Sequence, residues 1–342
     1  MPRSHTGPTR ARTQVIILGV LLLVVVACSS LSLFLGSRGV APHDIWHALL
    51  RPQSSPREIA VLVQELRLPR IAVGIAVGAA LGMAGALTQG HTRNPLADPG
   101  LLGVTSGASL SIVAAAFFLG ITAPSVQVWF AFGGAILGAA AVFVISALGG
   151  SATNPLTLIL AGSALSAFLT AMTTMLVLSD RGALDVQRYW QAGSVAGRDM
   201  SVLVELLPYL ILGAVIALLS GRALTLLGLG DSTARSLGVR PGMIRWSGFA
   251  AIVVLAGTAT AIAGPIAFVG LMVPHIARIL GGPDYRWVIP ASGLLGAILV
   301  VVADTIGRII VPPSEVQASI MLAFVGAPLF IMMVRRSIPV MP

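Results

Sequence analysis

Apolar segments of about 20 residues recur along almost the whole chain, and short stretches between them hold most of the charged residues. A helix needs about 20 consecutive apolar residues to cross the hydrocarbon core of a bilayer. Of the 342 residues, 56% are hydrophobic and only 10% are charged, whereas soluble domains carry about 25% charged residues. Such a composition cannot cover a water-facing surface of ordinary size. It excludes a soluble globular protein and indicates a membrane protein with many spans.

The apolar segments predict an all-α polytopic fold with about ten transmembrane helices. They lack the apolar–polar alternation of outer-membrane barrel strands. The seventh and eighth spans are separated at Gly264-Pro265, because a proline after a glycine marks a break. A single kinked helix there would leave nine spans and place the termini on opposite sides. The expected spans lie near residues 14–36, 70–90, 100–120, 125–148, 155–178, 201–220, 243–262, 265–281, 288–308 and 316–334.

The distribution of arginine decides the orientation. With ten spans and an internal N-terminus, the inner segments hold twelve arginines and three aspartates, and the outer segments hold nine arginines and nine acids. The entire net charge of +9 then lies on one side, as the positive-inside rule requires. We therefore expect both termini to be cytoplasmic. Residues 1–342 would form a single transmembrane domain, with residues 1–13 as a cytoplasmic tail and residues 221–242 as the longest cytoplasmic loop.

Several chemistries are excluded by residues that the sequence lacks. All 21 basic residues are arginines, so the chain cannot build a phosphate-binding P-loop, which needs a lysine. The single cysteine permits no cysteine-built metal site, and we expect no metal in this chain. The spans are also expected to hold no acidic residue at mid-depth, because Asp98 is assigned to an inner loop and Asp304 to an outer helix end. That pattern argues against an ion-coupled carrier and against a membrane enzyme, and favours a transport subunit driven by another chain.

The inner loop contains a candidate docking element. Asp231 is suited to cap the N-terminus of a short helix, and Gly238 is suited to end it in the left-handed conformation. This amphipathic helix could lie on the lipid headgroups or dock on a partner ATPase, and the residues alone do not decide between the two. The segment consists of Asp231, Ser232, Thr233, Ala234, Arg235, Ser236, Leu237, Gly238 and Val239.

Motifs spread from about Ile16 to Arg336 resemble the iron-siderophore, haem and cobalamin permease family, the transmembrane subunits of type II ABC importers. They occur in the order in which the family has them. The matching segments are Arg67-Leu-Pro-Arg70, Gly78–Gly85, Asn94–Gly103, Leu229–Val239, Gly264–Arg278, Ala303–Arg308 and Val325–Pro328.

The resemblance implies a complex of two permease subunits, identical or paralogous, two ATPase subunits and an extracytoplasmic binding protein. ATP and magnesium would then bind only on the ATPases, and this chain would hold no cofactor, catalyse nothing and bind no nucleic acid. The family pattern makes residues 231–239 the coupling helix and places Arg67, Arg70 and Arg308 where the binding protein docks. It places an inner gate at Asn94, Leu96, Pro155 and Leu156.

The segment from Arg188 to Arg198 is most similar to that of ferric-siderophore members of the family. The expected function is therefore import of a ferric siderophore across the bacterial cytoplasmic membrane. Haem and cobalamin remain alternative cargoes, and an ion-coupled secondary transporter remains the alternative mechanism.

Overall fold

The computed structural model describes residues 8–37, 39–148 and 155–337, and within them every regular element is helical. Ten helices make up the bundle, and each corresponds to one predicted span. They are α1 (Pro8–Phe34), α4 (Leu68–Thr92), α5 (Val104–Leu119), α6 (Pro124–Leu148), α7 (Pro155–Ser179), α9 (Met200–Leu227), α11 (Pro241–Ala263), α12 (Val269–Gly281), α13 (Tyr285–Ile309) and α14 (Ala318–Ser337).

Seven of the described helices are long and apolar enough to cross a membrane, while α5, α12 and the described part of α14 are shorter apolar helices. The predicted break at Gly264-Pro265 is confirmed: α11 ends at Ala263, and Gly264 has a φ of +75°. Helix α1 begins at Pro8, inside the predicted cytoplasmic tail of residues 1–13, and the tail stays a prediction. Residues 1–7 lie outside the described part of the chain.

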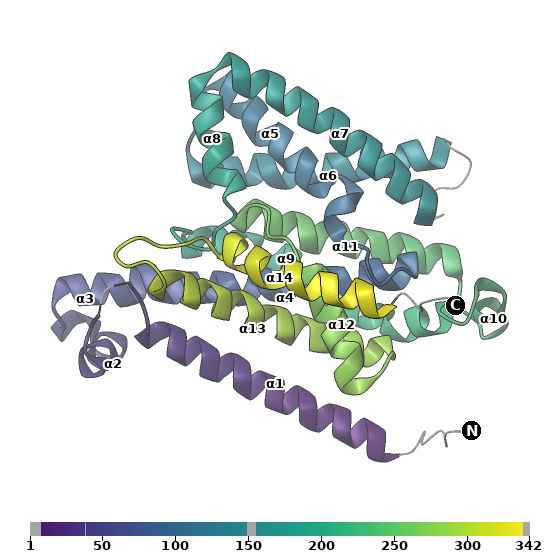
Figure 1. The fold of residues 1–342 in the computed structure, drawn as a ribbon, viewed down its shortest axis with the longest axis horizontal. Helices are drawn as coiled ribbons and strands as arrows, with labels where there is room; N and C mark the ends of the chain where they lie inside the picture. The colour runs from purple at the N-terminus through teal and green to yellow at the C-terminus, as the bar shows by residue number, and fades with distance from the viewer. Residues whose placement is uncertain (1–7, 38, 149–154, 338–342) are drawn as a thin grey trace.

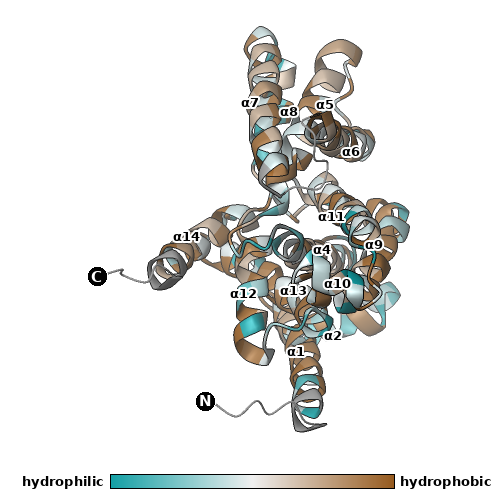
Figure 2. Ribbon diagram, turned by 90° about the vertical axis from the view of Figure 1, so that its right-hand side faces the viewer, coloured by the Kyte–Doolittle hydropathy of each residue, from teal (hydrophilic) through white to brown (hydrophobic). Residues whose placement is uncertain are grey.

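The helices form a main body and a smaller sub-bundle (Figure 1). In the main body, α4 packs against α13, α11 and α12, and α1 lies along α13. The sub-bundle contains α5, α6, α7 and the short helix α8 (Arg181–Gln191), which contact one another and meet the body mainly through α11. Viewed along the bundle, the sub-bundle projects from one side of the main body, next to α11 (Figure 2).

Glycines allow the helices of the main body to pack closely. An added Cβ at Gly78 of α4 would lie 2.3 Å from the carbonyl oxygen of Gly296 on α13. The same atom at Gly85 would lie 2.0 Å from the carbonyl oxygen of Gly270 on α12. Small residues at such positions are the usual basis of close helix packing in membranes. The glycines of α4 therefore allow it to pack closely against both α13 and α12 at the centre of the fold.

Short helices lie at both ends of the bundle. Helices α2 (Pro42–Leu50) and α3 (Arg57–Val61) lie at one end, and the π-helical turn η2 (Leu62–Arg67) leads from α3 into α4. The opposite end carries α10 (Asp231–Ser236), and there α1 begins and α14 finishes (Figure 1). The residues of α10 and its surroundings are largely hydrophilic, whereas most of the helices are largely hydrophobic (Figure 2). The assignment of this end to the cytoplasm rests on the arginine distribution.

The segment between α4 and α5 enters the body of the protein. Its 3-10 turn η3 (Pro99–Leu102) packs so closely on α7 that a Cβ at Gly162 would lie 2.0 Å from the Leu101 carbonyl oxygen. Asp98 lines a small internal cavity together with Leu81, which lies near the middle of α4. The prediction that no acid lies at mid-depth is therefore wrong. The hydropathy pattern did not predict the depth of Asp98, because a polar stretch between two apolar segments is typical of an external loop. In the structure, α5 and α12 instead begin inside the bundle.

Candidate functional site

Helix α10 is tied to the bundle by its first residue. Oδ1 of Asp231 lies 2.7 Å from Nη2 of Arg93, which follows α4, and Oδ2 lies 2.8 Å from Nη2 of Arg245 on α11. The prediction that Asp231 caps the helix is wrong. Gly230 occupies the N-cap position, and the Asp231 side chain makes no capping bond. Two charge-assisted bonds to guanidinium groups are stronger than one to a neutral amide, so the carboxylate turns toward the arginines.

The end of α10 is as predicted. Gly238 has a φ of +81°. Its amide donates to the Arg235 carbonyl and the Val239 amide donates to the Ala234 carbonyl, each at 3.0 Å. This is the paired bonding of a left-handed C-terminal cap. Ala234 is fully buried against the bundle, while Leu237 is 56% exposed, so the helix presents one apolar side chain outward.

The Asp231 carboxylate stays ionised. Burial raises the pKa of this group, but the charge of Arg245 and the hydrogen bond from Arg93 outweigh it and hold the pKa below the ordinary value of an aspartate. An ion pair thus joins α10 to the neighbouring ends of α4 and α11.

The three arginines predicted for docking converge at the opposite end of the bundle. Arg67 is 4% exposed and donates to the Leu33 carbonyl at 2.7 Å. Arg308 is 2% exposed and pairs with Asp304 at 3.3 Å. Arg70 binds both oxygens of Asp304, with Nε–Oδ2 and Nη2–Oδ1 distances of 2.8 Å. We call these four residues the outer arginine cluster.

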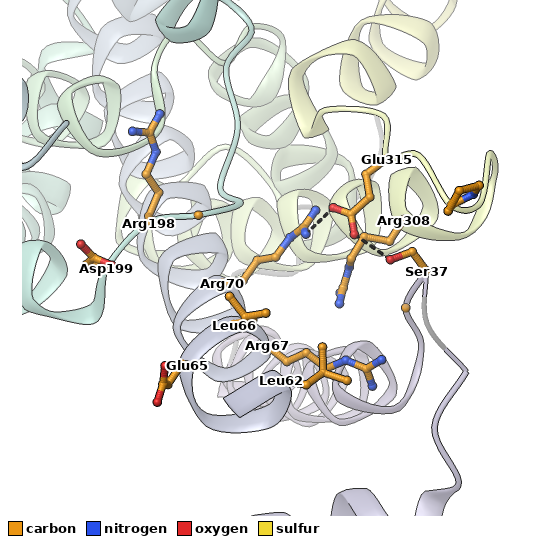
Figure 3. Close-up of a pocket in the computed structure, with 13 residues that line it drawn as sticks. Ser37, Leu62, Glu65, Leu66, Arg67, Arg70, Arg198, Asp199, Arg308 and Glu315 are labelled. Carbon is orange, nitrogen blue, oxygen red and sulfur yellow. Dashed lines mark hydrogen bonds and ion pairs between the residues drawn. The ribbon is translucent and has the colours of Figure 1, made fainter. Parts of the chain in front are cut away.

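The three arginines of the outer arginine cluster line a pocket of about 470 Å³. Nη1 of Arg70 points toward Glu315 and lies 2.6 Å from Oε2, while Ser37 donates to the other carboxylate oxygen at 3.0 Å (Figure 3). Arg198 lines the same pocket. All three predicted arginines line this pocket, and Glu315 holds Nη1 of Arg70 there. The docking role itself stays a prediction.

Sequence reasoning missed Glu315 and Arg198 as members of this pocket. Both lie in outer segments that the sequence shows to be charged, but their approach to Arg70 depends on how distant spans pack. Burial raises the pKa of Glu315. The hydrogen bond from Arg70 and the charge of Arg70 lower it by more, so the pKa lies below the usual value of a glutamate.

The residues predicted for the inner gate are only partly described. Asn94 and Leu96 lie in the turn after α4, where the Leu96 amide donates to Oδ1 of Asn94 at 2.9 Å. Leu96 is exposed. Pro155 and Leu156 begin α7, but their side chains lie outside the described part of the structure. The gate therefore stays a prediction.

No group of three or more metal-ligating side chains occurs among the described residues. His43 and His47 on α2 have ring centroids 4.7 Å apart, and Oδ1 of Asp44 lies 3.6 Å from Nδ1 of His43, but these side chains do not form a metal-holding group. The geometry thus consists of an anchored helix at one end of the bundle, a charged pocket at the other, and glycine-packed helices between them.

Residues 21–336 match the model of the FecCD transport family. The chain belongs to this family. It is 44% identical to the ferric enterobactin transport system permease protein FepD of Escherichia coli, over 97% of this chain and 98% of that protein. It is 38% identical to the probable siderophore transport system permease protein YfiZ of Bacillus subtilis, over 96% of this chain and 98% of the relative.

A solved structure shares the fold. It is an inward-facing conformation of a metal-chelate type ABC transporter, with a TM-score of 0.80, 30% sequence identity, and coverage of 94% of this chain and 99% of that one. The predicted all-α membrane fold and the predicted family are thereby confirmed. As a family member, the chain is a multi-pass membrane transport subunit.

Proposed function

We propose that this chain is the permease subunit of an ABC importer that carries a ferric siderophore across the bacterial cytoplasmic membrane. The relationship to ferric-chelate permeases over nearly its whole length carries the proposal. ATP would bind and be hydrolysed on partner ATPase subunits, since the chain has no lysine for a P-loop.

Helix α10 would receive the movement of the ATPase. It lies at the arginine-rich end of the bundle, presents Leu237 outward, and is joined by Asp231 to α4 and α11. A displacement of α10 would pull directly on two central helices, which is what a coupling element must do.

The pocket at the opposite end would receive an acidic side chain of an extracytoplasmic binding protein. Arg70 and Arg198 supply positive charge there, and Glu315 holds Arg70 in the absence of a partner. Complementary charge at a docking surface steers association and fixes orientation.

The decisive experiment is uptake in a strain that lacks the gene and in its complemented control. Radiolabelled iron is offered as ferric catecholate, hydroxamate and citrate chelates, beside haem iron and labelled cobalamin. Restored uptake of a ferric chelate supports the proposal. Restoration of haem or cobalamin alone would assign another cargo, and uptake that survives loss of the ATPase but collapses with an uncoupler would assign another mechanism.

Coupling is tested by Leu237→Asp, which places a charge on the exposed face of α10 without disturbing a buried contact. We expect loss of transport with unchanged amounts of protein in the membrane. Leu50→Asp is the matched control, because Leu50 is similarly exposed but belongs to α2 at the other end. Normal uptake with Leu237→Asp would refute the coupling role of α10.

A further inference from the structure

An apolar groove of about 280 Å³ lies where the sub-bundle meets α11. It is formed by residues 136–143 of α6, residues 246–254 of α11, Leu158 of α7 and Leu102 of η3, and we call it the α6–α11 groove. Every described residue that lines it is apolar, and the indole nitrogen of Trp246 is the only polar side-chain atom among them. A polar solute would find almost no hydrogen-bond partner there, so the groove suits an apolar ligand.

The α6–α11 groove has the length of one membrane leaflet. Helices α6 and α11 are both long and apolar enough to cross a membrane, and α11 lies between α6 and the main body (Figure 2). Positions 246, 250, 253 and 254 line the groove and recur at helical spacing, so they share one face of α11. From Trp246 to Val254 the helix rises about 12 Å, close to the half-thickness of about 15 Å of a hydrocarbon core. The groove therefore matches the acyl region of a single leaflet.

Trp246 marks the end of the groove that is nearer the start of α11. It is 55% exposed, and its ring centroid lies 3.9 Å from that of Phe143 on α6. The neighbouring helix thus holds the ring in place while much of it stays open to the surroundings. Tryptophan is enriched at the level of the lipid headgroups, because its ring is apolar and its N–H group is polar. The ring therefore indicates the depth at which acyl chains give way to headgroups.

Two arginines lie beyond Trp246, toward the end of the bundle. Arg240 precedes α11 and Arg235 belongs to α10; both are exposed, and both line a surface hollow together with Met243. Met243 is 61% exposed and lies three residues before Trp246, on the same face of α11. Within the part of the chain that the structure describes, neither arginine forms an ion pair, and the nearby Asp231 already binds two other arginines. Positive charge without an acidic partner therefore adjoins the headgroup end of the groove.

We propose that the α6–α11 groove binds an anionic phospholipid, with an acyl chain along α11 and the phosphate at Arg240. Along α11, the order arginine, tryptophan and apolar groove matches the order phosphate, glycerol and acyl chain of a lipid. Guanidinium groups bind phosphate with paired hydrogen bonds, and basic pockets beside membrane helices bind anionic headgroups. A lipid in this position joins α6 of the sub-bundle to α11 of the main body, whichever cargo is transported.

The test measures tryptophan fluorescence of the complete transporter in phosphatidylcholine vesicles. Brominated phosphatidylglycerol, which is anionic, or brominated phosphatidylcholine, which is zwitterionic, is included at equal mole fractions, because bromine quenches a tryptophan that it touches. We expect the anionic lipid to quench at the lower mole fraction. Trp246→Phe keeps an aromatic ring against Phe143 and should abolish this difference. Trp129→Phe is the matched control, since Trp129 is 41% exposed on α6 outside the groove, and it should leave the difference intact.

Arg240→Gln tests the headgroup contact at an exposed position, where the substitution should not disturb folding. One arginine near a membrane surface changes the binding of an anionic lipid about fivefold. The mole fraction of phosphatidylglycerol needed for half of the quenching should therefore rise about fivefold, and Arg240→Lys should restore most of the affinity. Arg222→Gln is the matched control and should change nothing, because Arg222 is an exposed arginine of α9 that lines neither the groove nor the hollow.

Every other outcome overturns the lipid site and leaves the transport proposal untouched. Equal quenching by the two lipids would show that the groove accepts any acyl chain and has no headgroup site. A difference that survives in Trp246→Phe would place the anionic lipid elsewhere. Equal losses in Arg240→Gln and Arg222→Gln would reduce the effect to the general charge of this end. No quenching of Trp246 by either lipid would mean that protein, such as a second permease subunit, covers the groove.

Discussion

At the scale of single residues, one carboxylate joins three elements at the inner end of the bundle. Asp231 begins α10 and binds Arg93 after α4 and Arg245 on α11. All three side chains are partly exposed, so the pair stabilises the fold by no more than about 1 kcal/mol. Its importance lies in the connection: it fixes where α10 stands relative to two central helices.

Asp231→Asn is therefore expected to weaken coupling far more than folding. The amide cannot hold two guanidinium groups, and α10 loses its attachment. We expect transport to fall roughly two- to thirtyfold, in line with coupling changes of about 0.5–2 kcal/mol, while the melting temperature stays nearly unchanged. Uptake and thermal unfolding are measured side by side, with Arg222→Gln as control because Arg222 is exposed on α9. A large drop in melting temperature would show that the residue acts through stability instead.

At the outer end, the ion pair between Glu315 and Arg70 should make the loop after α13 sensitive to acid. The folded-state pKa of Glu315 lies below the usual value. Its contribution, about 1 kcal/mol or less for a partly exposed group, is complete above the unfolded pKa of about 4.3. It is lost as the pH falls through the lower folded pKa.

Hydrogen exchange of residues 310–317 between about pH 6 and pH 3 measures this effect. Protection should be constant in the upper part of that range and decline below about pH 4. Glu315→Gln should show weak protection throughout and little pH dependence. Equal acid sensitivity in the variant would mean that another group titrates.

At the scale of the elements, the contact between α4 and α13 depends on glycine. A side chain at Gly78 would collide with the backbone of Gly296, which cannot move aside as a flexible side chain could. Gly78→Val should destabilise the protein by about 1–3 kcal/mol or more, the usual cost of overpacking. Gly133→Val on α6 is the control, because nothing lies within 4 Å of its added Cβ.

Thermal unfolding of the purified protein and its amount in the membrane report this difference. Gly133→Val should remain within about 0.5 kcal/mol of the unaltered chain. Comparable stability of the Gly78→Val variant would show that α4 and α13 can separate without cost.

The elements were predictable to different degrees for physical reasons. Long apolar runs and the Gly264-Pro265 break are local signals, and they predict the ten helices and the division between α11 and α12. The depth of Asp98 is not local, because it depends on glycine contacts such as that of Gly162 with Leu101. The sequence of residues 231–239 likewise predicts α10 and the Gly238 cap, which are local features. It does not predict the partners of Asp231, because they lie 138 and 14 residues away in the chain.

At the scale of the whole molecule, the sub-bundle leaves a polar face of α7 uncovered. Ser163, Thr170 and Thr174 are exposed at spacings of about one and two helical turns, so they share one side of the helix. Hydroxyl groups are an unusual surface to present to lipid tails. In the assembled transporter this side should face water along the transport pathway or a second permease subunit.

Accessibility to a water-soluble thiol reagent tests which helix faces meet water. Thr170→Cys, in a Cys28→Ser background, should react readily, because the reactive thiolate forms in water and not in lipid. Val215→Cys on α9 is the control: Val215 is an exposed apolar residue of a span without such a hydroxyl face and should stay unmodified. ATP hydrolysis by the complete complex should change the rate at Thr170 if the pathway opens and closes around α7. Equal, slow modification at both positions would place α7 against lipid, and the polar face would then need a protein partner in place of a pathway.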